Sequence, residues 1–334
     1  MGYSIGAQRM AQITDFGTTS TGESVDRITL SGGDLTVALL TWGAVVQSVR
    51  LAGVAHDLTL GSDHLADYEW QMRHHGSLIG PVANRISGAS AQIDGHTHRF
   101  EPNVDGRITL HSGAAGTHLK VWTLAAHSAD SATLTLALPD GEGGFPGNRQ
   151  ITAVFRVIAP ATLRLDVTAT TDATTLMNIA NHSYWNLDGT ADWSGHSLTV
   201  HADHYLPSTP DFTPTGEIAP VSGAMDFRKP KRFSPKHPPL DTNFCLADTR
   251  RALTHAVTLS GQSGTTLDLH TTEPGVQIYD GRAAIRPGHT AYEGVAIEAQ
   301  FWPDATTHAA FPAITLNPAQ DWHQITEWQF TRGA

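Results

Sequence analysis

The sequence predicts an all-β protein, a large antiparallel β-sandwich, from three features of its composition and patterning. Threonine, which favours strands, occurs 40 times, and glycine, which favours turns, occurs 31 times. Lysine and glutamate, the usual surface residues of helices, occur only 4 and 9 times. Apolar and polar residues alternate in many segments, as expected of strands with one buried face. Because the strands are too numerous for a single sheet, we expect two stacked layers. These layers would leave a concave face or a loop-lined cleft.

Five segments alternate clearly enough to be assigned as strands. In sequence order they are residues 35–39, 133–138, 163–168, 197–200 and 266–269. Clusters of turn-forming residues lie between them, at residues 139–144 and 207–210. The best helix candidate is short and covers residues 64–71.

The proline-rich stretch at residues 228–240 raises the question of a second domain. It holds three of the four lysines and could be a linker between domains. Strand patterning continues on both sides of it, which favours a long surface loop instead. We therefore expect a single domain over residues 1–334.

Charge and cysteine content exclude several classes of partner. The 21 basic and 32 acidic residues give a net charge of −11, without any run of Lys and Arg, so we expect no nucleic acid partner. No apolar stretch approaches the 18 or more residues of a membrane helix, so we expect no membrane partner. The single cysteine, Cys245, excludes an internal disulfide, and the first residues lack the apolar core of a signal peptide. We expect a cytoplasmic protein that binds a neutral polar ligand.

Three short polar segments are candidates for binding, although each also has a purely structural interpretation. Asn84 and Arg85 lie in GPVANRISG, where the arginine is either a solvated turn residue or a planar group that holds hydroxyls or a carboxylate. His111 precedes small residues that would let a ligand approach the backbone, or it is a structural histidine. Asp241, in DTNF, precedes a predicted strand and could be a simple turn residue.

The segment at residues 178–187, NIANHSYWNL, favours a functional interpretation on its own. It contains amides, the imidazole of His182 and two aromatic side chains within ten residues. As one strand it would place His182 and Tyr184 on one face and Trp185 on the other. A purely structural strand rarely carries so many hydrogen-bonding groups, because each needs a partner once buried.

Glu298 is a candidate general base because of its surroundings in the sequence. It follows the apolar run at residues 295–297 and precedes two aromatic residues, in a chain that has few glutamates. Burial raises the pKa of a carboxyl group, hydrogen-bond donors lower it, and the balance can set it for proton transfer.

No motif points to a metal or an organic cofactor, so we expect neither. His96 and His98, and His201 with Asp203 and His204, have spacings that could bind a cation, but neither a cysteine nor an HExxH motif accompanies them. We interpret them as surface histidines. The sequence also lacks GxGxxG, a P-loop and the GxSxG elbow of α/β-hydrolases.

Taken together, these segments resemble the aldose 1-epimerase (galactose mutarotase) family. Seven motifs occur in the family's order and cover nearly the whole chain. They are GxxANRI at 80–86, LHxG at 110–113, NHSYxN at 181–186, PTGEI at 214–218, DxNF at 241–244, EPGVQ at 273–277 and ExQxxPD at 298–304. One such motif alone would be weak evidence for the family, whereas seven in the same order are strong evidence.

The resemblance implies an antiparallel β-sandwich with an open sugar-binding cleft, and an isomerase that interconverts the α and β anomers of an aldose such as glucose or galactose. It implies that Glu298 is the general base and His182 the general acid. It also implies that five residues hold the monosaccharide substrate: Asn84, Arg85, His111, Asp241 and Tyr279. The implied reaction requires no cofactor or metal, and we expect a monomer or a homodimer.

The chain departs from the family pattern at Ser112, Thr242, Trp185 and Trp302, and these departures put the choice of sugar in doubt. Three other functions stay open at this point. They are a non-catalytic carbohydrate-binding domain, a glycoside hydrolase that uses Glu298 and Asp241, and a hexose-phosphate epimerase. The last would need basic residues near the cleft beyond Arg85, and the sequence does not identify any.

Overall fold

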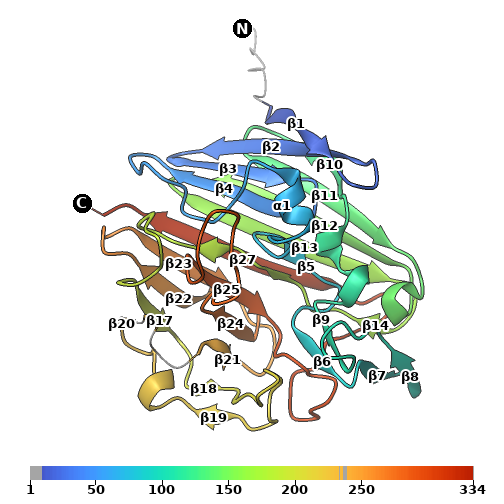
Figure 1. The fold of residues 1–334 in the computed structure, drawn as a ribbon. Helices are drawn as coiled ribbons and strands as arrows, with labels where there is room; N and C mark the ends of the chain where they lie inside the picture. Colours follow the sequence, from blue (N-terminus) through green and yellow to red (C-terminus); the bar gives the residue numbers. More distant parts are fainter. Residues whose placement is uncertain (1–9, 233, 236–238, 334) are drawn as a thin grey trace, which may run out of the picture.

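The computed structural model describes residues 10–232, 234–235 and 239–333, and it contains three larger sheets and four two-stranded pairs (Figure 1). A four-stranded sheet has the order β1 (Gln12–Thr18), β2 (Ser24–Gly32), β3 (Leu35–Leu40), β4 (Val45–Leu51). A nine-stranded sheet has the order β10 (Thr123–His127), β11 (Ser131–Leu138), β12 (Arg149–Ile158), β13 (Thr162–Thr171), β27 (Trp322–Thr331), β23 (Thr266–Thr271), β22 (Thr254–Ser260), β17 (Ser197–Val200), β20 (Lys231–Arg232).

A six-stranded sheet carries much of the candidate site. Its order is β16 (Tyr184–Trp185), β25 (Val295–Gln300), β24 (Gly275–Tyr279), β21 (Asp241–Cys245), β18 (His204–Tyr205), β19 (Ala219–Pro220). The two-stranded pairs are β5 (Leu78–Ile79) with β15 (Ala180–Asn181), β6 (Arg85–Ser87) with β9 (Ile108–Leu110), β7 (Ser90–Ile93) with β8 (His96–Arg99), and β14 (Thr175–Leu176) with β26 (Thr315–Leu316). The helices are α1 (Leu65–Glu69) and the short 3₁₀ turns η1 (Gly113–Ala115), η2 (Thr117–Leu119), η3 (Glu142–Gly144) and η4 (Gly223–Met225).

The predicted all-β antiparallel fold is confirmed, and all five segments assigned from alternation are strands. They correspond to β3, β11, β13, β17 and β23. The helix candidate corresponds to α1, which is the only α-helix among the described residues. Its five residues are too few to be stable alone, so it depends on Leu65 and Tyr68, which are buried.

The segment at residues 178–187 is not one strand, which corrects the prediction. It forms β15 and β16, which pair with β5 and with β25 respectively, and His182 and Ser183 lie between them. The predicted faces hold nevertheless for three side chains: His182 and Tyr184 line a cavity, and Trp185 is buried in the hydrophobic core. The stretch at residues 228–240 contains β20, and residues 233 and 236–238 lie outside the described part.

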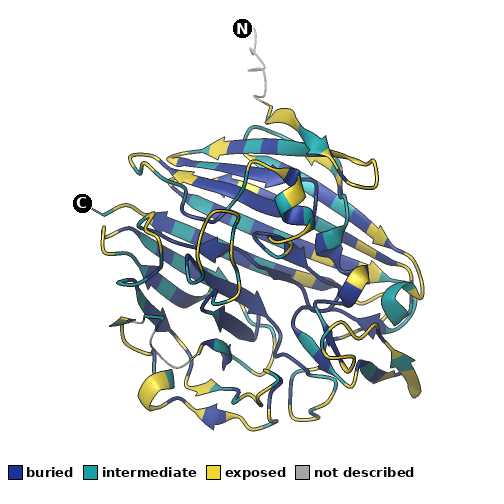
Figure 2. Cartoon of the chain, viewed as in Figure 1, coloured by how far each residue is buried: buried dark blue, intermediate teal, exposed yellow. Residues whose placement is uncertain are grey.

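The main core lies between the nine-stranded sheet and the six-stranded sheet, and it continues into the four-stranded sheet. One hydrophobic cluster contains alternate residues of β13 and β23 from the first sheet and of β24 and β25 from the second. Figure 2 shows buried positions alternating with more exposed ones along β13 and β23, whereas β25 is buried throughout. Because side chains alternate along a strand, the opposite face of β24 and β25 is free to carry polar groups.

No helix in the described ranges is long and apolar enough to cross a membrane.

Candidate active site

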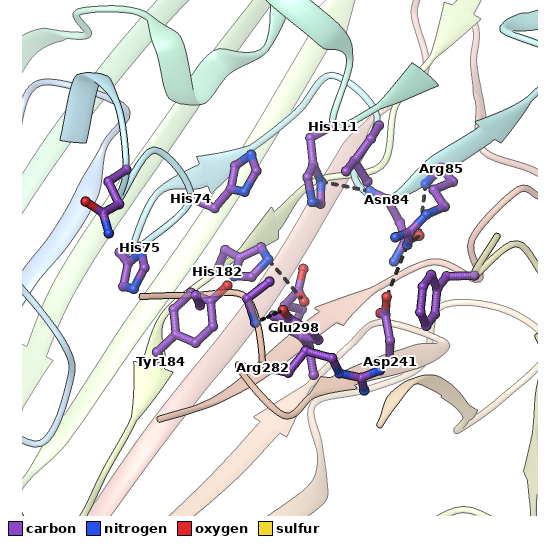
Figure 3. A pocket seen from close by; sticks show the side chains of 16 residues that line it. His74, His75, Asn84, Arg85, His111, His182, Tyr184, Asp241, Arg282 and Glu298 are labelled. Carbon is purple, nitrogen blue, oxygen red and sulfur yellow. Dashed lines mark hydrogen bonds and ion pairs between the residues drawn. The ribbon is translucent and has the colours of Figure 1, made fainter. Parts of the chain in front are cut away.

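A cavity of about 400 Å³ brings together all seven residues that the sequence singled out (Figure 3). They come from segments far apart in the chain: the interior strands β25, β24 and β21 of the six-stranded sheet, the β6–β9 pair and the break between β15 and β16. The complete lining is Gln71, His74, His75, Asn84, Arg85, Leu110, His111, His182, Tyr184, Phe212, Asp241, Tyr279, Arg282, Ala283, Ala284 and Glu298.

Glu298 points into the cavity from the middle of β25. Its neighbours Ile297 and Ala299 face the hydrophobic core, so strand alternation directs the carboxyl group to the opposite side. The residue is only 2% exposed. Burial raises the pKa of this carboxyl group well above its usual value, and the charge of Asp241 acts in the same direction, while Arg85 opposes them.

His182 lies against Glu298, with 3.5 Å between His182 Nε2 and Glu298 Oε1. Its position is fixed by the backbone: its N–H donates to Ser77 O (2.9 Å), and its carbonyl accepts from Gly76 N (3.0 Å). Burial lowers the pKa of the imidazole to about 4. Burial therefore favours a neutral carboxyl group next to a neutral imidazole.

Arg85 and Asp241 form an ion pair on another wall, with 3.4 Å between Nη1 and Oδ2. Asp241 Oδ1 also accepts a hydrogen bond from Gln277 Nε2 at 2.6 Å. The Arg85 backbone N–H donates to the side-chain oxygen of Asn84 (2.9 Å). Both charges are thus compensated before any substrate is bound, and the cavity presents a fixed pattern of donors and acceptors.

His111 and Asn84 are locked together by two hydrogen bonds. The Asn84 N–H donates to His111 Nδ1 (3.1 Å), and the His111 N–H donates to the Asn84 carbonyl (2.9 Å). Both residues have positive φ angles, 54° for His111 and 63° for Asn84. Backbone strain of this kind is characteristic of functional sites. Burial keeps the His111 pKa well below its usual value, so the neutral ring carries its proton on Nε2, the other nitrogen.

Tyr279 supplies an aromatic ring at the end of β24. Its hydroxyl oxygen accepts a hydrogen bond from Ala283 N (2.9 Å), which ties the following loop to the strand. Its ring lies edge-on to Tyr184, with 6.2 Å between centroids. Burial raises the pKa of its hydroxyl group to about 12.

Six lining residues with polar or aromatic side chains were not among the predicted site residues. They are Gln71, His74, His75, Tyr184, Phe212 and Arg282. Tyr184 lies in the polar segment that the sequence analysis noted, and the adjacent histidines 74 and 75 form a pair that could have been a signal. Phe212 and Arg282 carry no recognisable motif, because loops bring them to the cavity.

The predicted surface histidines lie away from this cavity. His96, His201 and His204 are exposed, and His98 is partly exposed. No group of three or more His, Cys, Asp or Glu side chains in the described part of the chain is arranged to hold a metal ion.

Comparison with known proteins shows the family to which the chain is related. The aldose 1-epimerase family model matches residues 26–329. The chain belongs to the aldose 1-epimerase family. This membership confirms the predicted family and, with it, the predicted class of enzyme, an isomerase that acts on aldoses.

Curated members of the family match over almost the full length of both chains. A galactose mutarotase of Homo sapiens is 32% identical, over 93% of this chain and 96% of the relative. An aldose 1-epimerase of Escherichia coli K12 is 29% identical, over 89% and 92%. Among solved structures, a galactose 1-epimerase from Lactobacillus acidophilus superposes with a TM-score of 0.85 at 26% identity, covering 97% of this chain and 99% of the other.

The four departures from the family pattern lie outside the wall of this cavity. Ser112 Oγ donates to Val82 O (3.0 Å) and accepts from Val82 N (2.9 Å). Trp302 donates to Pro274 O (2.9 Å), Trp185 is buried in the core, and Thr242 is buried within β21.

Proposed function

We propose that this chain interconverts the α and β anomers of a free aldose, with Glu298 as general base and His182 as general acid. The observation that carries the proposal is the 3.5 Å contact between these two groups inside one cavity. The anomeric hydroxyl oxygen O1 and the ring oxygen O5 are bonded to the same carbon, C1. An acid and a base that act on them must therefore lie close together.

Ring opening transfers two protons and needs no other reactant. Ionised Glu298 takes the proton of the O1 hydroxyl while protonated His182 gives a proton to O5, and the C1–O5 bond breaks to leave an open-chain aldehyde. Rotation about C1–C2 presents the other face of the carbonyl group. Neutral His182 then takes the proton from O5, protonated Glu298 returns one to O1, and the ring closes as the other anomer.

The two pKa shifts favour ring opening. A carboxylate whose pKa is raised is a stronger base, and an imidazolium whose pKa is lowered is a stronger acid. The open-chain complex contains neutral Glu298 and neutral His182, which are the forms that burial favours. Each positioned group contributes typically about 10²- to 10⁴-fold to the rate.

The remaining predicted residues would hold the sugar. Arg85, Asp241 and Asn84 offer hydrogen bonds to hydroxyl groups from one wall, and the Nε2–H of His111 is placed to donate to an oxygen as the ring opens. Tyr279 would cover an apolar face of the sugar. We propose glucose or galactose as substrates, in keeping with the galactose mutarotases among the relatives.

The cavity gives little support to the alternative functions. A hydrolase would need Asp241 free to act as the second carboxyl group, but Arg85 and Gln277 already engage both of its oxygens. A phosphate-binding site would need an unpaired cation. Arg282 is a second arginine of the cavity, yet it makes two hydrogen bonds to Asp280 (2.9 and 2.8 Å), which compensates its charge.

We also propose that residues 1–334 form one domain in the cytoplasm. The family match over residues 26–329 and the hydrophobic cluster that joins the three larger sheets support the first part. Residues 1–9 and 334, part of this prediction, lie outside the described residues. A monomer or homodimer stays a prediction.

Saturation-transfer NMR tests the proposed reaction. Freshly dissolved α-glucose and α-galactose should exchange anomers much faster with the protein than without it, and chromogenic glycosides should stay intact. His182→Gln should lose about 10²-fold or more in kcat. Rapid glycoside cleavage, or a His182→Gln effect confined to KM, would contradict the assignment.

A further inference from the structure

The cavity contains an imidazole that the reaction above does not use. We propose that His74 is a further substrate-binding residue, which exchanges hydrogen bonds with a sugar hydroxyl and so helps to select the sugar. This inference rests on the proposed function. It adds a contact on the cavity wall formed by the segment between α1 and β5, from which the sequence analysis assigned no residue.

His74 completes a triangle of imidazoles around the acid. Its ring centroid lies 4.8 Å from that of His111 and 5.7 Å from that of His182, and these two are 5.5 Å apart. The rings of His74 and His182 are nearly parallel, with 23° between their planes. Figure 3 shows His74 beside His111 and His182, on the side of the cavity away from Asp241. A sugar that touches both other rings would lie within reach of the third.

The ring nitrogens of His74 have no hydrogen-bond partner within residues 10–232, 234–235 and 239–333. The backbone carbonyl of His74 accepts from Ser77 Oγ (3.0 Å), which anchors the segment, but the side chain makes no such bond. His111, by contrast, already uses Nδ1 to accept from Asn84. His74 is also partly exposed, whereas His75, His111, His118 and His182 are buried. Among these five histidines, His74 is therefore the one whose unbonded ring nitrogens a sugar can reach most easily.

The charge around His74 selects the kind of group that it can bind. It faces His118 of η2, His182, and His111 after β9, and it is flanked by Arg73 and His75. Burial, and then the charges that these neighbours can carry, keep the pKa of His74 well below its usual value. The ring is neutral, with one donor and one acceptor nitrogen. That pattern matches a hydroxyl group, which both donates and accepts, and not a carboxylate or a phosphate.

The competing interpretation is that His74 is a spacer that only supports the ring of His182. A spacer would act on every sugar equally, since its effect would pass through His182. A hydrogen bond to one hydroxyl would act only on sugars that carry this hydroxyl. Deoxy sugars therefore separate the two roles.

The test compares His74→Phe with the unchanged chain on glucose, galactose and their 2-, 3-, 4- and 6-deoxy forms. Phenylalanine keeps a planar ring but removes both nitrogens. We expect KM for glucose or galactose to rise about 3- to 10-fold, the value of one hydrogen bond, with kcat within about twofold. For one of the deoxy sugars, KM should be the same in both proteins, which identifies the hydroxyl. An equal increase for every sugar, a loss confined to kcat, or no change would overturn the proposal.

Two further variants keep the test decisive. If His74→Phe does not fold, His74→Gln and His74→Met provide the same comparison, because these side chains have similar length and only glutamine can form the hydrogen bonds. His96→Asn, on the exposed strand β8, is the matched control for loss of a histidine and should leave KM unchanged. Dissociation constants from NMR titration give the same comparison without turnover, so a failure of the proposed reaction would not be mistaken for a failure of this contact.

Discussion

At the scale of single residues, the proposed reaction depends on how Glu298 and His182 share one proton. Burial raises the pKa of the first and lowers that of the second, so in the free protein the neutral pair dominates. The reactive arrangement, with ionised Glu298 and protonated His182, contains the same number of protons. Both forms belong to the singly protonated pair, and the pH dependence reports that pair as a unit.

The pH profile of kcat/KM should consequently be bell-shaped. Below the His182 pKa of about 4 both groups are protonated and no base is present, so activity falls on the acid side. Above the raised pKa of Glu298 both are deprotonated and no acid remains, so activity falls on the alkaline side. Exchange rates measured from pH 3 to 10 check this. An acid limb near the usual histidine value of 6.5 would contradict the assignment.

The seven site residues could be predicted chiefly because the segments that contain them resemble family motifs in order. Only the segment of His182, with more polar groups than a structural strand needs, and the unusual setting of Glu298 indicated function on their own, and Tyr279 came from the resemblance alone. His74, Phe212 and Arg282 could not be predicted in this way. Loops bring their side chains to the cavity, and the paths of those loops depend on contacts distant in sequence, such as the ion pair between Asp211 and Arg107 (2.9 Å).

At the scale of elements, Gly76 joins the histidine segment to the strands that hold the acid. Its N–H donates to the His182 carbonyl (3.0 Å), and its own carbonyl accepts from Val46 N (2.8 Å) and Asn181 Nδ2 (2.8 Å). Its φ angle is +70°, and a Cβ atom there would meet the Val46 carbonyl at 2.3 Å. The position therefore accepts only glycine.

Gly76→Ala should lower the free energy of unfolding by about 2 kcal/mol or more and reduce kcat as well, because the backbone shift would displace His182. Urea denaturation and the anomer exchange assay measure the two effects. Gly95→Ala, also at a positive φ angle but with open space around it, is the control for backbone strain alone. Equal stability and activity of both variants would show that Gly76 does not position the acid.

Alternation predicted elements where a strand has one buried and one exposed face, as in β11 and β13. It failed at residues 178–187, because all ten residues are buried and no exposed positions alternate with them. Which strand each short piece joins depends on β5 and β25, and neither partner can be identified from this segment alone.

At the scale of the whole molecule, five histidines, four buried and one partly buried, make stability depend on pH. The pKa of His182 is lowered to about 4 and those of His75 and His118 to about 3, while those of His74 and His111 lie well below the usual value, all chiefly through burial. In the unfolded chain these groups return to about 6.5. Their contribution to stability is complete above pH 6.5 and is lost as the pH falls towards 3 to 4. Glu298 and Glu273, with raised pKa values, act in the opposite sense but are fewer.

The urea midpoint should therefore fall steadily between pH 6.5 and pH 4. His118→Asn removes one of these proton-binding groups without touching the lining of the cavity, and its midpoint should fall less steeply over the same range. A midpoint that is flat or that rises on acidification would contradict the burial of these histidines.

The overall architecture could be predicted as a class but not as a topology. The nine-stranded sheet places β27 between β13 and β23, so that residues near the end of the chain pair with residues 162–169 and 266–271. Alternation shows that a strand has one buried face, but it does not show which strand lies beside it. The cavity depends likewise on the order of the six-stranded sheet, which places β25 next to β16.

The most direct test of the central claim is anomer exchange by Glu298→Gln, measured by saturation-transfer NMR together with the dissociation constant of the sugar. Glutamine keeps the shape of the side chain but cannot take the proton from O1. We expect kcat to fall about 10²-fold or more, with sugar binding within a few-fold of normal. Exchange at a near-normal rate in this variant would show that Glu298 is not the base.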